Sequence, residues 1–328
     1  MKRRILVIAA TALVLCAATA AASAFFTPAT VSSAGGVTTS TIAAPTSPSA
    51  VGGSSITLNW TATTSTYATG TRVLRGSASG GPYSQIALVT PRTTTTYVDY
   101  PPGPGTYYYV LQSYYQQWTS ANSAQVSAAR TTIAFVQSAT AAGTTTTTAT
   151  FTTTPVSGDL LVAVAATRNA GTITGPVGWT LAIDSGATST PHQAIYYKVA
   201  GALESKSVAV ATTASGTGNG LHVYELSGAT TVRATGSATG SSTTPASGSV
   251  TPSVAYTGII AATVANFGTG LSGWTNSFGE IVDFTAGSGG AKTLLAGAGV
   301  LATSAGTYST TATNTTTGAW LGQIVAFG

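Results

Sequence analysis

The sequence has 328 residues, which is enough for two domains of ordinary size, each with its own core. Charged residues make up only 6% of it, against about 25% in an ordinary soluble domain. Three of the 12 basic residues lie at positions 2–4; the other nine (12 − 3) are spread singly along the chain and oppose seven acidic residues. This distribution argues against nucleic-acid binding, which needs several converging Lys or Arg side chains.

The first 24 residues have the pattern of a secretory signal peptide. Residues 2–4 are basic, an apolar run follows, and residues 22–24 read A-S-A, as a cleavage site requires. The single cysteine, Cys16, falls in this segment, so the mature chain would hold no disulfide and no thiolate metal site. We therefore expect a secreted protein, extracellular or at the cell surface, that meets a membrane only through this segment before cleavage. The alternative is an uncleaved anchor, although the run 5–22 is near the lower length limit for crossing a bilayer.

Residues 25–50 are small, polar and interrupted by proline, which is typical of a linker. From residue 51 to residue 129, apolar residues alternate with polar ones in short runs separated by turn residues. This period of two predicts an antiparallel β-sandwich domain over 51–129.

Several segments of this part carry a more specific pattern. Trp60 lies in the run SSITLNW, residues 96–99 read TYVD, and residues 105–113 read GTYYYVLQS. With the prolines that precede the first strand, they make residues 44–128 resemble a fibronectin type III domain. The resemblance implies an immunoglobulin-like sandwich in which Tyr107 donates a hydrogen bond to upstream backbone at a corner.

Within the run that follows Gly105, alternate residues should face opposite sides of the sheet. We expect Tyr109, Leu111 and Ser113 to point inward, and the alternate residues, including Val110 and Tyr114, to face solvent.

Residues 130–328 contain further short apolar runs separated by Gly, Ser, Thr and Pro, and no helical period persists. We expect one large antiparallel β-sandwich of jelly-roll type with about ten to twelve strands. The runs 160–166 and 258–265 are apolar on both faces, which predicts that they are central strands covered on both sides.

The segments PVSGDLLVAV at 155–164, GPVGWTLA at 175–182 and YELSG at 224–228 are similar to a β-sandwich module of secreted bacterial surface proteins and phage virion proteins. The likeness spans about residues 131–328. It implies an extracellular, non-catalytic domain and supplies no catalytic residues.

The candidates for catalysis and metal binding are few. His192 and His222 are the only histidines, and His222 and Glu225 are three apart on a predicted strand, so they should point to opposite faces. A half-exposed His222 and a hydrogen-bonded structural Glu225 are therefore favoured over a shared metal site. His192 and Asp184 have no predicted partners. We predict no catalytic residue, no metal and no cofactor, and hence no enzyme.

Glycoside hydrolysis needs two carboxylates that face each other across a cleft. Asp99, Asp159 and Asp184 lie next to turn-forming residues. Glu225 is the one carboxylate within an apolar run, and it is therefore the first candidate for a raised pKa.

Aromatic residues are the remaining candidates for ligand binding. Tyr114, Tyr115 and Trp118 close the first domain, and Trp274 lies in a glycine-rich segment of the second. We predict these four as candidate ligand-binding residues, and the other tryptophans as core: Trp60, Trp179 and Trp320.

The sequence favours a secreted bacterial structural or adhesive protein that contacts cell-surface or matrix components, including glycans, and self-associates through edge strands poor in charge. The alternative is a pair of carbohydrate-binding accessory modules that accompany polysaccharide-degrading enzymes.

Overall fold

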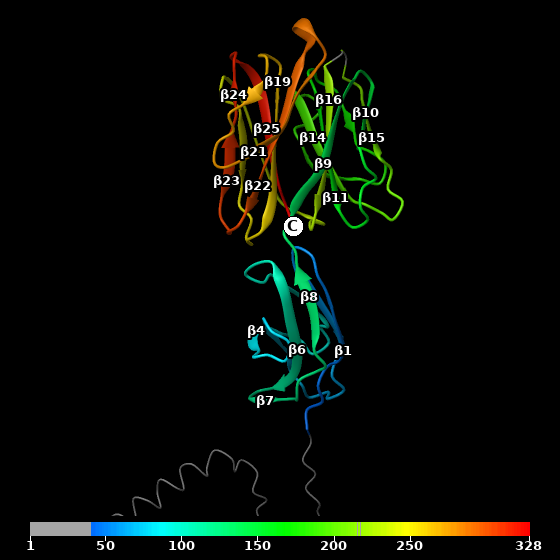
Figure 1. Ribbon diagram of the computed structural model, residues 1–328, viewed down its shortest axis with the longest axis vertical. Coiled ribbons are helices and arrows are strands. Elements are labelled where there is room, and N and C mark those ends of the chain that lie inside the picture. Colours follow the sequence, from blue (N-terminus) through cyan, green and yellow to red (C-terminus); the bar gives the residue numbers. More distant parts are fainter. Residues whose placement is uncertain (1–40, 215, 217) are drawn as a thin grey trace, which may run out of the picture. The chain divides into compact units, whose positions relative to one another are not determined.

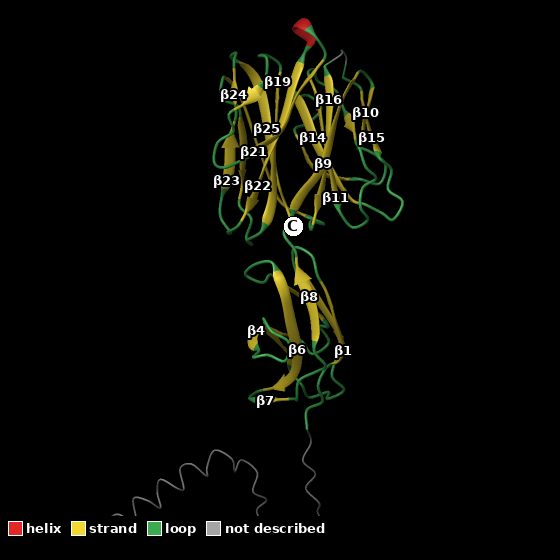
Figure 2. Cartoon of the chain, in the orientation of Figure 1, coloured by secondary structure: helices red, strands yellow, loops and turns green. Residues whose placement is uncertain are grey.

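The computed structural model describes residues 41–214, 216 and 218–328, and almost all of its regular structure is β-strand (Figures 1 and 2). The predicted signal peptide, Cys16 and residues 25–40 of the predicted linker lie outside the described residues. Within the described residues, the one helix is the three-residue 3₁₀ helix η1, Gly289–Ala291, and no helix is long and apolar enough to cross a membrane. The all-β class and the antiparallel pairing expected from the sequence are confirmed.

The first sandwich consists of two antiparallel sheets. One has the strand order β1-β2-β5, and the other has the order β4-β3-β6, with β7 and β8 both paired to β6. The strands are β1 (Thr46–Val51), β2 (Ile56–Thr61), β3 (Gly70–Gly76), β4 (Ser84–Val89), β5 (Thr96–Asp99), β6 (Gly105–Tyr115), β7 (Trp118–Thr119) and β8 (Val126–Arg130). Trp60 lies in the core between the sheets, as predicted.

Strand β6 shows which face of the second sheet is inward. Tyr109, Leu111 and Ser113 are all buried, which confirms the predicted inward face. Val110 and Tyr114, expected to face solvent, are buried as well. For Tyr114 the reason is that the guanidinium of Arg72 on β3 lies over its ring, with the Arg72 Cζ atom 5.7 Å from the ring centroid.

Two copies of one strand arrangement follow. The first repeat comprises β9 (Ala134–Gly143), β10 (Thr146–Thr150), β11 (Leu160–Thr167), β12 (Ile173–Thr174), β13 (Thr180–Asp184), β14 (His192–Val199), β15 (Ser207–Thr212) and β16 (Asn219–Ser227). The second repeat comprises β17 (Val232–Ser242), β18 (Ala246–Val250), β19 (Thr257–Ala265), β20 (Leu271–Ser272), β21 (Gly279–Ala286), β22 (Thr293–Ala302), β23 (Tyr308–Thr311), β24 (Thr313–Asn314) and β25 (Gly318–Phe327).

The strand orders of the two repeats match. The five-stranded sheet of the first is β13-β14-β11-β16-β9, and that of the second is β21-β22-β19-β25-β17. The outer sheet of the first is β10-β15-β12; in the second, β18 pairs with β23, and β20 pairs with β24. The jelly-roll-like part over 130–328 is therefore a structural duplication. Its described residues form the strands β9 to β25, more than the ten to twelve expected, because the strand arrangement occurs twice.

Irregularities in the strand pairing fix the alignment of the repeats. A β-bulge follows Leu181 where β13 pairs with β14, and another follows Glu280 where β21 pairs with β22. A second pair of bulges follows Phe135 in β9 and Val232 in β17. Bulges mark specific positions in a sheet, so their coincidence allows the two repeats to be compared residue by residue.

The five-stranded sheets of the two repeats face each other and share one core. This core takes alternate residues of β11 and β16 from the first repeat and of β19 and β25 from the second. In Figure 1 these strands lie side by side, green in the first repeat and yellow to red in the second. Strands β11 and β19 are buried along their whole length, which confirms that the runs 160–166 and 258–265 are central.

Candidate functional site

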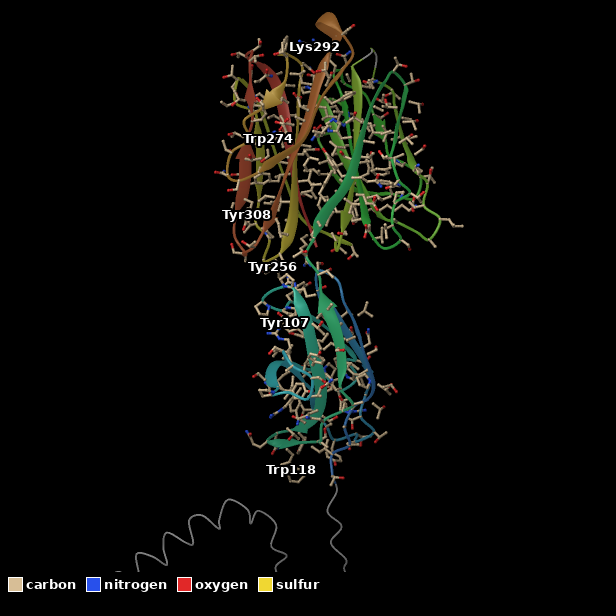
Figure 3. The ribbon with its side chains drawn as sticks, viewed as in Figure 1. Tyr107, Trp118, Tyr256, Trp274, Lys292 and Tyr308 are labelled. Carbon is tan, nitrogen blue, oxygen red and sulfur yellow. The ribbon has the colours of Figure 1, made fainter. Side chains whose placement is uncertain are left out.

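Three exposed aromatic side chains gather at one hairpin of the first sandwich. Tyr115 and Trp118 are directly paired across β6 and β7, and the ring of Tyr67 meets the ring of Tyr115 edge-on, with 6.1 Å between their centroids. Their exposed fractions are 39% for Tyr67, 38% for Tyr115 and 48% for Trp118. We call these three residues the aromatic cluster. Figure 3 labels Trp118 within it.

The other two predicted binding residues lie elsewhere. Tyr114 is 9% exposed and is adjacent to Tyr115 on β6, so its side chain points to the opposite face. Trp274 belongs to the second repeat, where it is half-buried and packs against the core that includes Phe278 (Figure 3). Its Nε1 is buried and has no hydrogen-bond partner among the described residues. Tyr67 was missed because it lies in a turn-rich segment, where no strand periodicity indicates exposure.

His192 and Asp184, expected to lack partners, bind each other. The Nε2 of His192 lies 2.6 Å from Oδ1 of Asp184, because β13 and β14 are consecutive antiparallel strands that bring the two residues together. The Nδ1 of His192 lies 2.7 Å from the carbonyl oxygen of Gly171. A carbonyl only accepts, so Nδ1 is the donor there. Both ring nitrogens are engaged and His192 is fully buried, which makes the pair structural.

His222, expected to be half-exposed, is completely buried in the core between the two repeats. Its Nδ1 lies 3.2 Å from the hydroxyl oxygen of Tyr224, and its Nε2 has no partner among the described residues. The ring also meets the ring of Phe284 edge-on, with 5.7 Å between centroids. Desolvation by burial lowers the pKa of His222 from 6.5 to about 3. The imidazole is therefore neutral at physiological pH.

Glu225 is buried and hydrogen-bonded, as expected. Its Oε1 accepts from the backbone N–H of Val156 at 2.7 Å, and its Oε2 accepts from the side-chain amide of Gln137. Asp159 is its acidic neighbour. Burial raises the pKa of Asp159, and the charge of Glu225 and a hydrogen bond between the two carboxyl groups raise it further. The hydrogen bond from Val156 to Glu225 ties the segment before β11 to strand β16, so the role of Glu225 there is structural.

In the part of the chain that the structure describes, no three His, Cys, Asp or Glu side chains come together as a metal ion would require. The aromatic cluster is the strongest candidate for contact with another molecule, because each of its three rings is more than a third exposed.

Comparisons with known proteins give structural similarities only. No family model and no curated protein matches the chain. A fibronectin type III-like protein from Clostridium thermocellum is 34% identical over 28% of this chain and 96% of its own, with a TM-score of 0.25. The chicken CNTN1 FN1–FN3 domains are 12% identical over 56% of this chain and 62% of their own, with a TM-score of 0.35. A segment of two fibronectin type III domains from chicken tenascin is 12% identical over 57% of this chain and 93% of its own, with a TM-score of 0.22.

The first sandwich carries its own structural signature. Its two sheets group β1, β2 and β5 on one side and β3, β4, β6 and β8 on the other. The hydroxyl of Tyr107 donates a hydrogen bond to the carbonyl oxygen of Gly103 at 3.0 Å, which confirms the predicted tyrosine corner. By strand order and by this corner, residues 46–130 have a fibronectin type III-like fold.

Proposed function

We propose that this chain is a secreted, non-catalytic adhesive protein of a bacterial surface or extracellular matrix, and that its aromatic cluster binds glycans. The observation that carries the proposal is the grouping of Tyr67, Tyr115 and Trp118 at one hairpin, each more than a third exposed. Tyr and Trp combine an apolar ring with a polar edge, so a group of them offers stacking surface and hydrogen bonds together.

The surroundings of the cluster support a neutral ligand. Only 6% of the whole chain is charged, and the hairpin itself carries Gln116 and Gln117 between the two aromatic residues. Amide side chains both donate and accept hydrogen bonds, as hydroxyl-rich ligands require. The cluster lies at a strand end, where a ligand would not disturb the core of the sandwich.

A glycan array with the mature protein tests this function. We expect Trp118→Ala to weaken binding at least tenfold and Tyr115→Ala to weaken it less. Leu88→Ala is the control, because Leu88 is 52% exposed in the same sandwich but lies on β4, which is separated from β6 by β3. Failure of the wild-type protein to bind any glycan, or binding that is indifferent to Trp118→Ala, would contradict the proposal.

A second candidate function is self-association into a matrix. Strand β17 is an edge strand of 11 residues, and among the described strands it pairs only with β25. Its single charged residue is Arg233. Long edge strands without protective charges tend to pair with other chains. We expect sedimentation velocity to show concentration-dependent oligomers that Thr239→Lys reduces. A monomer at all concentrations would rule out this function without affecting the glycan proposal.

Secretion is supported by the pattern of residues 1–24 and has its own test. We expect protein recovered from the culture medium to begin at Phe25 when its N-terminus is sequenced. An intact N-terminus in the membrane fraction would favour the anchor instead.

A further inference from the structure

Arg130, the last residue of β8, binds both the first sandwich and the second repeat. Its side chain is buried, with the residue 3% exposed. Its Nε donates to the carbonyl oxygen of Ser54 at 2.9 Å, and its Nη1 donates to the carbonyl oxygen of Pro101, both in the first sandwich. Its Nη2 donates to the carbonyl oxygen of Ala255 in the second repeat at 2.7 Å. The planar guanidinium therefore connects three backbone segments that are far apart in the sequence.

Tyr256, the residue after Ala255, adds a ring contact to these hydrogen bonds (Figure 3). The Cζ atom of Arg130 lies 5.0 Å from the centroid of the tyrosine ring, within the range of a cation–π interaction. Tyr256 has a φ of 56°, a left-handed backbone conformation that is strained for a bulky residue. Such strain persists only where neighbouring contacts hold it, and the ring contact with Arg130 is a contact of this kind.

A second arginine makes the same type of contact in the opposite direction. Arg233 of β17 donates from its Nη1 to the hydroxyl oxygen of Tyr100 at 3.2 Å, and its Cζ lies 4.8 Å from the centroid of that ring. Tyr100 directly follows β5 of the first sandwich. Burial lowers the pKa of Arg130, and the nearby charge of Arg233 lowers it as well. Two cations close together are unfavourable in a chain with so few charges, which points to a role for their contacts.

The covalent connection between the first sandwich and the repeats does not fix their orientation by itself. Residues 131–133 alone join β8 to β9. Rotation about a single connection is prevented only by contacts that lie away from it. The contact from Arg130 to the second repeat spans 125 residues of sequence, and the contact from Arg233 to the first sandwich spans 133. Both are therefore contacts of the required kind, and Ala43–Gly328 form one compact unit.

We propose that Arg130 and Arg233 fix the orientation of the first sandwich relative to the second repeat, so that the two move as one body. The aromatic cluster lies at the other end of β6 from these contacts. Gly105, at the start of β6, pairs with Arg130. Tyr115, at its end, pairs with Trp118 of the cluster. The two arginines thus hold the aromatic cluster at a constant distance from the repeats, whatever the cluster binds.

Residual dipolar couplings of the backbone amides, measured on the full mature chain in a weakly aligned medium, test this proposal. We expect the couplings from residues 46–130 and 134–327 to fit one alignment tensor in the wild-type protein. Arg130→Ala should give two tensors whose magnitudes differ at least twofold, because the first sandwich then reorients independently. Arg92→Ala is the matched control and should keep one tensor, since Arg92 donates to the carbonyl oxygen of Thr63 at 2.9 Å within the first sandwich.

A second variant separates the orientation from the stability of the first sandwich, to which Arg130 also contributes. The double variant Arg233→Ala/Tyr256→Gly removes both ring contacts and leaves the bonds from Arg130 to Ser54 and Pro101 intact. Glycine adopts a φ of 56° without strain, so the turn keeps its backbone conformation. The hydrogen bond from Arg130 to Ala255 then remains, and one bond does not fix an orientation. This variant should also give two tensors.

Two results would overturn the proposal. One is a pair of tensors in the wild-type protein. The other is a single tensor in the double variant or in a folded Arg130→Ala protein, which would mean that the short connection holds the orientation without the arginines. If Arg130→Ala unfolds the first sandwich, as the loss of dispersed amide signals from β2 and β6 would show, the comparison of the double variant with Arg92→Ala still decides.

Discussion

The two repeats share a topology but fill their common core differently. His222 in the first repeat and Gln323 in the second occupy equivalent positions, facing each other's repeat. Gln323 pairs with Gln193: the Nε2 of Gln193 donates to Oε1 of Gln323 at 3.1 Å, and the Nε2 of Gln323 donates to the backbone carbonyl oxygen of Gln193 at 3.2 Å. The Oε1 of Gln193 has no hydrogen-bond partner among the described residues. His222 meets the ring of Phe284 edge-on instead, and Leu295 lies against Gly220, two residues before His222 on β16.

The different core residues of the two repeats show which features are needed to pack their five-stranded sheets together. The central strands and the bulges are the same in both repeats, whereas the residues that meet at the shared core are individually different. Packing of complementary volume is enough to hold two such sheets together, even where a buried polar atom such as Nε2 of His222 has no hydrogen-bond partner among the described residues.

The largest effect on stability is expected from removing a large side chain from the core that the two repeats share. Phe327 is completely buried there, at the position that Leu226 holds in the first repeat. Phe327→Ala should lower the free energy of unfolding by about 3–5 kcal/mol through lost burial and a cavity. Urea unfolding measures this, with Phe267→Ala, at a site 43% exposed, as the control. A loss below about 1 kcal/mol would mean that the two sheets are not packed as one core.

A smaller, pH-dependent effect should distinguish His222 from its counterpart Gln323. Its pKa is lowered to about 3 in the folded protein, so folding favours the neutral ring. The folded protein is therefore most stable above pH 6.5, where the ring is neutral in both the folded and the unfolded chain. This stability is lost as the pH falls toward 3, because the unfolded chain then binds a proton at His222 that the folded protein does not. Between pH 6.5 and pH 4.5 the loss is about 2–3 kcal/mol.

His222→Gln should remove this part of the acid sensitivity, because the variant then carries the residue of the second repeat. Denaturant unfolding at several pH values measures the slope, and His192→Gln controls for the other histidine. An unchanged slope in His222→Gln would mean that other groups cause the acid sensitivity.

The smallest effect is expected at the carboxyl pair, which only the first repeat contains. Asp159 and Glu225 correspond to Thr257 and Ala326 in the second repeat. Burial and Glu225 raise the pKa of Asp159, so the folded state favours the protonated acid. Asp159 therefore contributes its full stabilisation below the ordinary pKa of an aspartic acid. This stabilisation is lost as the pH rises through the pKa that Asp159 has in the folded protein.

Asp159→Asn should therefore stabilise the protein at pH 7, by less than about 1 kcal/mol because Asp159 is partly exposed. The gain should disappear near pH 3. Thermal unfolding at the two pH values checks this, and a gain that is equal at both would contradict the assignment.

Much of this architecture could be predicted from local patterns. Two-faced apolar runs identified β11 and β19 as central, and the spacing of Tyr107 identified the corner of the first sandwich. The duplication could not be recognised from the same patterns, because the equivalent residues differ so much: Leu160 is replaced by Gly258, and Tyr197 by Gly299. Alternation with a period of two predicts which face of a sheet a side chain lies on, but it does not predict which type of residue is found there.

The candidate site was predicted in part. Tyr115 and Trp118 could be predicted because they lie at the end of a predicted strand. Tyr67 could not, because only the folding of a turn brings it next to them. The pairing of Asp184 with His192 could have been inferred, because the runs that contain them are consecutive predicted strands whose near ends must meet. The burial of His222 could not, because it depends on a second sheet that lies across the strand.

The connection between the repeats is short: β16 ends at Ser227 and β17 begins at Val232, with Gly228 turning the chain at φ 77°. Two separate copies of such a sandwich would hold together only as long as their concentration exceeded the dissociation constant. Joined in one chain, they meet at a fixed effective concentration whatever the dilution outside. The pairing of the two sheets therefore does not depend on how dilute the protein is.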